Sequence, residues 1–164
     1  MIEKFVLLSK RFYDEYPSEL YPEMQQKEKR PYLVVIVTVR DLTFAIPMRH
    51  HIAHRFSFIT NKPERWGLDY TKSVVITSDD FISDIKRQVL VDENEYYLIN
   101  ENKARILRDF QKYLDYYERA VLRGTPTRDP VICFSALQYF HKELGISYKS
   151  LIQKDKKITP PTVS

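Results

Sequence analysis

The chain has little cysteine and little glycine among its 164 residues. Its single cysteine, Cys133, excludes a disulfide within the chain and is typical of a reducing, cytoplasmic location. Its three glycines, at positions 67, 124 and 145, are too few and too scattered to form a glycine-rich phosphate loop. The composition therefore argues against nucleotide chemistry of the P-loop kind and against a dinucleotide-binding site.

Long hydrophobic runs are also absent. The longest apolar run, Tyr32 to Val39, is interrupted by Thr38 and is far shorter than the roughly 20 residues that span a bilayer. The apolar part of the N-terminal stretch Met1 to Leu8 is too short for a signal peptide, and no small-residue cleavage site follows it. We therefore expect a cytoplasmic protein with no membrane partner.

The charge balance is mildly basic. The chain has 26 Lys and Arg against 22 Asp and Glu, which gives a net charge of +4 and a pI of about 9.0. This balance permits binding to nucleic acid without indicating it. The aromatic content, 12 Tyr and 9 Phe, is large for this length, and tyrosine can stack on unpaired bases as well as line a core. We expect most of these rings in the core and at its rim.

The order of strand-like and helix-like segments predicts an α+β fold in one domain, residues 1–154, followed by a flexible tail, residues 155–164. The clearest strands pair as a hairpin through a tight turn at Arg40 and Asp41, and Pro47 is expected to end the second strand. The expected strands cover 5–8, 32–39, 42–46, 56–59, 72–76 and 96–99.

Helical spacing and capping residues mark the expected helices. The longest is expected to begin at Asn100 and to stop at Gly124. Its apolar stripe consists of Ile106, Phe110, Tyr113, Leu114, Tyr117 and Val121. Shorter helical segments are expected at 10–16, 81–85 and 135–144. Residues 61–70 are expected to form a loop.

Three of the four histidines fall in one short window after Pro47. The window reads Arg49-His50-His51-Ile-Ala-His54 and follows an expected strand, so its side chains project from a rigid frame. RNA cleavage without a metal needs a base for the 2′-hydroxyl, an acid for the leaving 5′-oxygen and a cation for the phosphate. Histidines, which titrate near neutrality, and an arginine can supply all three.

Two other interpretations of these residues stay open. His50 and His54 are four residues apart and share a face if they lie on a helix, so they could hold a metal ion should Asp69 or Asp79 arrive in space. The histidines could equally be structural and bond backbone groups near a helix end. Spacing alone does not decide between catalysis, metal binding and structure.

Two further segments combine cations with residues that suit RNA. Lys29 and Arg30 precede Tyr32 at the entry to the central strand, which fits contacts to phosphate and base as well as a solvated loop end. Farther along, Asp69 is a candidate acid and Lys72 a candidate phosphate ligand. A turn followed by a strand is the plainer account of that second segment.

The long helix carries many basic side chains. Arg108 and Lys112 are candidates for a strip along an RNA backbone, and a solvated outer face is the competing interpretation because acidic residues lie between them and their neighbours. Cys133 precedes an apolar segment and has no hydrolase signature beside it. We expect that thiol to be buried rather than nucleophilic.

Four motifs occur in an order that resembles one toxin family. They are Arg30-Pro-Tyr, Phe44-Ala-Ile-Pro-Met-Arg-His-His-Ile-Ala-His54, Gly67-Leu-Asp-Tyr-Thr-Lys72 and Cys133-Phe-Ser-Ala-Leu-Gln-Tyr-Phe-His141. From about Phe12 to Leu144, the chain resembles the toxins of type III toxin–antitoxin systems. It is most similar to the CptN and TenpN branches, which are distant relatives of ToxN and AbiQ.

The resemblance implies a metal-independent endoribonuclease that needs no cofactor and leaves a cyclic phosphate on its mRNA substrates. It implies inhibition by a small RNA antitoxin, usually a pseudoknot that the toxin cuts from a repeat precursor, and a toxin–RNA hetero-oligomer that serves in plasmid maintenance or phage defence. The implied fold is a strongly twisted antiparallel sheet surrounded by helices, similar to MazF and ToxN.

The resemblance also implies roles for individual residues. Arg49 would hold the scissile phosphate, and His51 or His54 would transfer protons. The segment Lys29, Arg30 and Tyr32 would flank the groove, and Lys72 would reach in from the neighbouring strand. Serine is common in the family where this chain has His50, so the resemblance leaves open whether that imidazole takes over a catalytic role.

Two other functions remain as alternatives at this point. The first is an RNA-binding regulator without catalysis, whose affinity would depend on salt because phosphate contacts release counterions. The second is a metal-dependent hydrolase that uses the histidine cluster.

Overall fold

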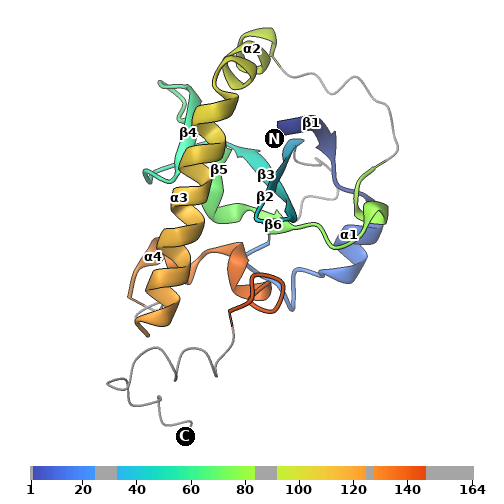
Figure 1. Ribbon diagram of the computed structural model, residues 1–164. Coiled ribbons are helices and arrows are strands. Elements are labelled where there is room, and N and C mark those ends of the chain that lie inside the picture. The colour runs from blue at the N-terminus through green and yellow to red at the C-terminus, as the bar shows by residue number, and fades with distance from the viewer. Residues whose placement is uncertain (1, 25–32, 84–91, 125–127, 147–164) are drawn as a thin grey trace, which may run out of the picture.

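The computed structural model of the protein describes residues 2–24, 33–83, 92–124 and 128–146. The predicted RNA contacts Lys29, Arg30 and Tyr32 lie outside the described residues, and so does the predicted tail, 155–164. The described part has an α+β architecture, as predicted, with a six-stranded antiparallel sheet and four α-helices (Figure 1). Among the described helices, none combines the length and the apolar character needed to span a membrane.

The sheet is organised around β3. Its strand order is β1-β2-β3-β5-β4, and β6 pairs with β3 outside this path. β3 therefore has three partners, which are β2, β5 and β6. The strands are β1 (Ile2–Leu7), β2 (Leu33–Val39), β3 (Leu42–Arg49), β4 (Ser57–Asn61), β5 (Trp66–Asp69) and β6 (Val74–Val75).

The hairpin of β2 and β3 forms as predicted. Arg40 and Asp41 both have positive φ, 54° and 59°, which is the two-residue turn whose twist suits paired strands. The Arg40 guanidinium bonds to Asp115 and to Glu118, so the turn is tied to a helix. Four consecutive residues of β2 are buried and the strand lies between β1 and β3, which confirms an internal strand.

The prediction that Pro47 ends the second strand is wrong, because β3 continues to Arg49. Proline has no N–H to donate to a sheet, so it needs a position where no neighbour requires that bond. On this side of β3, β6 pairs with Phe44 and Ala45, and β5 pairs with Met48 and Arg49. Pro47 lies between the two pairings and pairs with β2 on the other side.

The helices correct several predictions. Residues 96–99, predicted as a strand, lie within α2, and the long helix begins at Lys103 rather than Asn100. Residues 61–70, predicted as a loop, contain β5, and the predicted helix 135–144 is only a short 3-10 turn. The helices are α1 (Lys10–Glu15), α2 (Glu93–Glu101), α3 (Lys103–Leu122) and α4 (Pro130–Cys133), with 3-10 turns η1 (Tyr70–Lys72), η2 (Asp79–Phe81) and η3 (Ala136–Tyr139).

The long helix α3 covers one face of the sheet (Figure 1). All six residues of its predicted apolar stripe are buried, which confirms the stripe. Phe110 of α3 contacts Phe44 of β3, with ring centroids 5.1 Å apart. The 3-10 turn η1 packs there too, because Tyr70 lies 5.7 Å from the same Phe110 ring.

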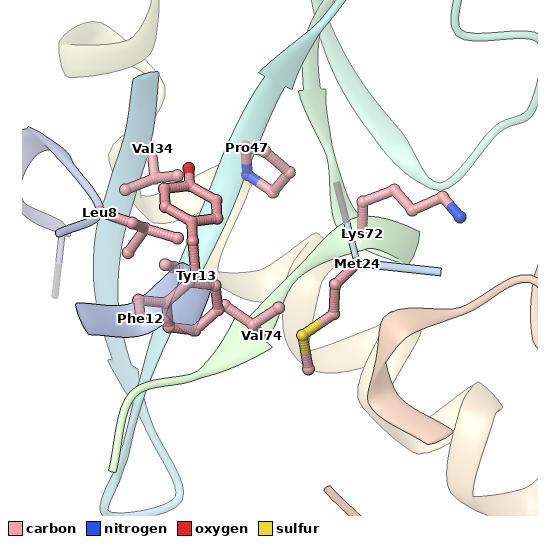
Figure 2. A pocket seen from close by; sticks show the side chains of 9 residues that line it. Leu8, Phe12, Tyr13, Met24, Val34, Pro47, Lys72 and Val74 are labelled. Carbon is pink, nitrogen blue, oxygen red and sulfur yellow. The ribbon is translucent and has the colours of Figure 1, made fainter. Parts of the chain in front are cut away.

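The opposite face of the hairpin is covered by α1. Figure 2 shows Phe12 and Tyr13 of this helix facing Val34 and Pro47, across a small apolar pocket. The cavity has a volume of about 20 Å³, which is room for about one water molecule. This pocket is a packing defect of the core and is too small to hold a substrate.

Candidate active site

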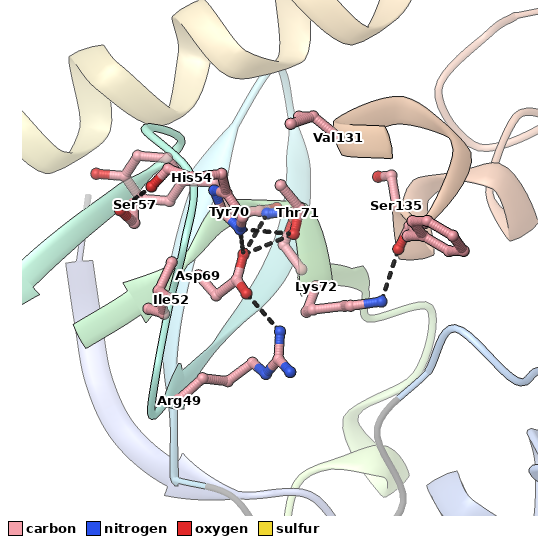
Figure 3. A network of polar contacts seen from close by, with 12 residues as sticks. Arg49, Ile52, His54, Ser57, Asp69, Tyr70, Thr71, Lys72, Val131 and Ser135 are labelled. Carbon is pink, nitrogen blue, oxygen red and sulfur yellow. Dashed lines mark hydrogen bonds and ion pairs between the residues drawn. The ribbon is translucent and has the colours of Figure 1, made fainter. Parts of the chain in front are cut away.

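The candidate site is built around a buried carboxylate. Asp69 ends β5 and is fully buried, and the side chains of Arg49 and His54 from the predicted histidine window meet it (Figure 3). Arg49 Nη1 donates to Asp69 Oδ2 over 2.7 Å, and His54 Nε2 lies 3.1 Å from Asp69 Oδ1. The two oxygens therefore face different partners, one from the end of β3 and one from the segment that follows it.

Thr71 completes the environment of Asp69. Its backbone N–H and its hydroxyl both donate to Oδ1, over 3.0 and 2.6 Å, so Asp69 caps the 3-10 turn η1. The Thr71 hydroxyl oxygen also lies 3.4 Å from His54 Nε2. A buried charge is tolerated when it is paired and hydrogen-bonded, and Asp69 meets both conditions.

These contacts decide the ionisation of Asp69. Burial by itself would raise the pKa of the carboxyl group, because the charged form loses its hydration. The hydrogen bonds from His54 and Thr71, the charge of His54 and the hydrogen bond from Arg49 outweigh burial and lower the pKa below its ordinary value. Asp69 is thus an anion at neutral pH and serves as a fixed anchor for the cations around it.

Close packing of two strands positions Arg49. It is the last residue of β3 and pairs with Gly67 of β5. A Cβ at Gly67 would lie 2.0 Å from the carbonyl oxygen of Phe58 in β4, so only glycine lets the three strands approach this closely. The Arg49 side chain is 30% exposed, and a guanidinium carries five N–H donors. Donors beyond the one used on Asp69 are available for a phosphate.

The segment that carries His54 is held by the turn before β5. The Arg65 guanidinium donates to the carbonyl oxygens of Ile52, over 2.8 Å, and of His54, over 3.4 Å. The backbone N–H of Ile52 also donates to the carbonyl of Arg65. His51 and Arg65 both have positive φ, 54° and 53°, a conformation that costs energy for residues with side chains and that clusters at functional sites.

The three histidines of the window differ in their surroundings. The ring of His54 is oriented by Asp69, and its Nδ1 is buried without a hydrogen-bond partner in the described part of the chain. His51 is exposed. His50 is exposed as well and stacks on Trp66, with ring centroids 4.0 Å apart and planes inclined by 10°. The structure thus brings Arg49 and His54 together and directs the His50 ring to Trp66.

The predicted phosphate ligand Lys72 follows Asp69 by three residues, but its side chain is directed away from the carboxylate (Figure 3). Its ammonium donates to the carbonyl of Phe134 over 2.7 Å and to the carboxylate of Glu23 over 3.0 Å. Lys72 therefore joins separate segments of the chain. Arg108 and Lys112, the other predicted contacts in the described part, are exposed on α3.

Sequence reasoning weighed Asp69 as a candidate acid and as a possible metal ligand, and it missed Thr71 and Trp66. The spacing Asp-x-Thr is a signal for Thr71, because an aspartate can accept bonds from the backbone and hydroxyl two residues on. No sequence signal identifies the partner of Trp66, since it depends on strand register. Among the residues that the structure describes, no group of three or more His, Cys, Asp or Glu is placed to hold a metal ion.

In comparisons with known proteins, no family model, no curated protein and no solved structure matches the chain.

Proposed function

We propose that this protein is a metal-independent endoribonuclease and the toxin of a type III toxin–antitoxin system. One observation carries the proposal. The motifs Phe44–His54 and Gly67–Lys72, which carry most of the family resemblance, are separate in sequence. They meet in space, because Arg49 and His54 of the first motif contact the Asp69 carboxylate of the second. The α+β architecture of the described residues is compatible with a twisted sheet of the MazF and ToxN kind.

The proposed reaction uses the RNA's own 2′-hydroxyl as nucleophile. His51, which is exposed, takes the proton from this hydroxyl as its oxygen bonds to the phosphorus. The bond from phosphorus to the 5′-oxygen breaks, that oxygen takes a proton from water, and a cyclic phosphate remains. Arg49 holds the phosphate as its charge grows, while Asp69 and His54 keep the guanidinium in place.

The proposed partners are a small RNA antitoxin and mRNA substrates, joined with the protein in a toxin–RNA hetero-oligomer. Arg108 and Lys112 are one helical turn apart on the exposed side of α3 and supply sequence-independent contacts to an RNA backbone. A short tandem repeat followed by a terminator, directly upstream of the gene, would support an antitoxin RNA of this kind.

The test is RNA cleavage in EDTA by purified protein, together with growth after induction in bacteria. We expect the wild-type chain to cut single-stranded RNA in chelator, to leave cyclic phosphate ends and to arrest growth. Arg49→Ala and His51→Ala should each lower the cleavage rate by at least about 100-fold, because each removes a group that acts in the transition state. Both variants should also relieve the growth arrest.

Arg11→Ala is the matched control for Arg49→Ala. Arg11 also pairs with an aspartate, Asp80, at 2.5 Å, but both side chains are more than half exposed and lie away from the site. This variant should cut RNA and arrest growth like the wild type. If Arg49→Ala and His51→Ala still arrest growth and cut RNA, the site is assigned wrongly.

A second candidate function is an RNA-binding regulator without catalysis. Two features favour it: Arg49 pairs internally with Asp69, and the Nδ1 of His54 is buried. A cluster that only stabilises the fold would show the same features, and it would leave the protein without catalytic groups at this place. The same assay separates the two functions. A regulator binds RNA in a salt-dependent way and yields no product in EDTA.

A further inference from the structure

We propose that the stacked rings of His50 and Trp66 form a binding platform for one unpaired base of single-stranded RNA, beside the phosphate held by Arg49. This inference rests on the proposed function, since it names how the same site recognises its substrate. It also separates His50 from the proton-transfer groups, and assigns it to base binding instead.

Strand register creates the ring pair. Arg49 pairs with Gly67 in the antiparallel ladder of β3 and β5. His50, which follows Arg49, therefore stands opposite Trp66, which precedes Gly67. The rings of these two residues lie parallel at a centroid distance of 4.0 Å. The carbonyl of Trp66 also accepts a bond from the Thr60 hydroxyl over 3.3 Å, which ties the start of β5 to β4.

The outer side of this pair is open. Trp66 is half-buried and His50 is exposed, so the His50 ring lies on the more solvent-accessible side of the stacked pair. The His51 ring stands nearly perpendicular to it, at 81° and 6.4 Å, and forms the side of a corner. A flat, exposed π-surface on a rigid strand end is the feature on which proteins stack unpaired bases.

The neighbourhood suits RNA rather than another planar ligand. Arg49 and His50 are consecutive in the chain, with Cα atoms about 3.8 Å apart. Successive residues of a strand project to opposite faces, so a phosphate contact at Arg49 and a base contact at His50 would lie on the two sides of the end of β3. The platform has no contact with Asp69 among the described residues, whereas Arg49 and His54 both contact it. His50 therefore has an aromatic partner in place of the acidic partner that orients His54.

The experiment measures binding separately from cleavage. A short, fluorescently labelled 2′-O-methyl RNA cannot be cut, because its nucleophile is blocked, and its affinity follows from anisotropy. Trp66 is the chain's single tryptophan, so its intrinsic fluorescence reports on this location alone. We expect this RNA to change the Trp66 emission, and the same oligomer made entirely of abasic residues to leave it unchanged.

Two substitutions of His50 separate stacking from proton transfer. His50→Ala removes the ring and should weaken binding of the 2′-O-methyl RNA by about tenfold. His50→Phe keeps a flat ring that cannot carry a proton, so its affinity for the 2′-O-methyl RNA should stay within about twofold of wild type. The abasic oligomer should bind the wild type and His50→Ala equally.

The outcomes for the two proposals differ. The platform is refuted if RNA is cleaved but Trp66 emission and affinity do not respond to the base or to His50→Ala. It is also refuted if His50→Phe loses kcat as His51→Ala does, because His50 would then act in the chemistry. If no RNA is cleaved while base-dependent and His50-dependent binding persists, the nuclease proposal fails and the platform stands.

Discussion

Asp69 concentrates the electrostatics of the site in a single residue. A buried carboxylate is costly unless cations and hydrogen bonds compensate it, and Asp69 receives Arg49, His54 and two donors from Thr71. The carboxylate therefore lets a guanidinium and an imidazole stand together at the end of one hairpin.

Replacing Asp69 by asparagine tests this role. Asp69→Asn keeps the shape of the side chain but leaves Arg49 and His54 without a counterion, so we expect a loss of about 3 kcal/mol in the free energy of unfolding. Cleavage by the fraction that remains folded should fall by at least about tenfold, because Arg49 loses its fixed position. Urea denaturation gives the stability, and the cleavage rate is measured well below the denaturation midpoint.

Asp80→Asn is the control for this change. Asp80 pairs with Arg11 at the surface, and such pairs contribute at most about 1 kcal/mol. The substitution should therefore cost little stability and no activity. Wild-type cleavage by folded Asp69→Asn protein would show that the carboxylate serves stability alone.

For the individual residues of the site, the sequence predicts the arrangement only in part. Spacing identifies Arg49 and His54, because cationic and titratable groups after a strand are a recognisable pattern. It does not predict that His50 faces Trp66 or that Lys72 faces Glu23, because these orientations follow from strand register and from contacts between distant segments. Whether His51 transfers a proton remains a prediction.

Among the secondary-structure elements, local rules succeed where local chemistry dominates. The turn at Arg40 and Asp41, and the apolar stripe of α3, are read directly from the sequence and are confirmed. The strand predicted at 96–99 is wrong, because Asp92 caps a helix there and acidic residues in the first turn favour it. β3 extends past Pro47 because the partner strands change at that point, which no local pattern reveals.

The packing of β4 on β5 predicts a strong effect of Gly67→Ala. The new methyl group would overlap the carbonyl oxygen of Phe58 and push the strands apart, so we expect a loss of about 3 kcal/mol or more in the free energy of unfolding. Because Gly67 pairs with Arg49, RNA cleavage should fall as well. Thermal and urea denaturation, with cleavage assays at low temperature, measure both effects.

Gly145→Ala is the comparison for this substitution. Gly145 has a φ of +71° but nothing within 4 Å of an added Cβ, so only backbone strain opposes the change. A cost of about 1 kcal/mol and unchanged cleavage are expected. Equal costs for both substitutions would contradict the close strand contact at Gly67.

For the whole molecule, two titratable groups, His141 and Asp69, predict how stability depends on pH. Burial lowers the pKa of His141, whose Nε2 lies 2.6 Å from the Tyr117 hydroxyl, so the unfolded chain takes up a proton first as the pH falls below about 6.5. Asp69, with its lowered pKa, stays ionised in the folded state while its unfolded form protonates near pH 3.8. Stability should therefore decline on acidification through both groups.

Urea midpoints measured from pH 8 to pH 3 check this expectation. His141→Gln should remove the part of the decline that begins below about pH 6.5, since glutamine does not titrate there. Asp69→Asn should remove the part below about pH 4. Unchanged pH profiles in both variants would show that neither group is linked to folding.

The central place of β3 in the sheet affects which parts of the molecule open locally. Proteins open locally, and the edges of a sheet open more often than its middle. Among the described strands β1, β4 and β6 each pair with a single neighbour, while β3 keeps partners on both sides. Fraying of these edges therefore leaves the Arg49 guanidinium anchored, so the phosphate contact that we propose for it would persist through fluctuations that loosen the rest of the sheet.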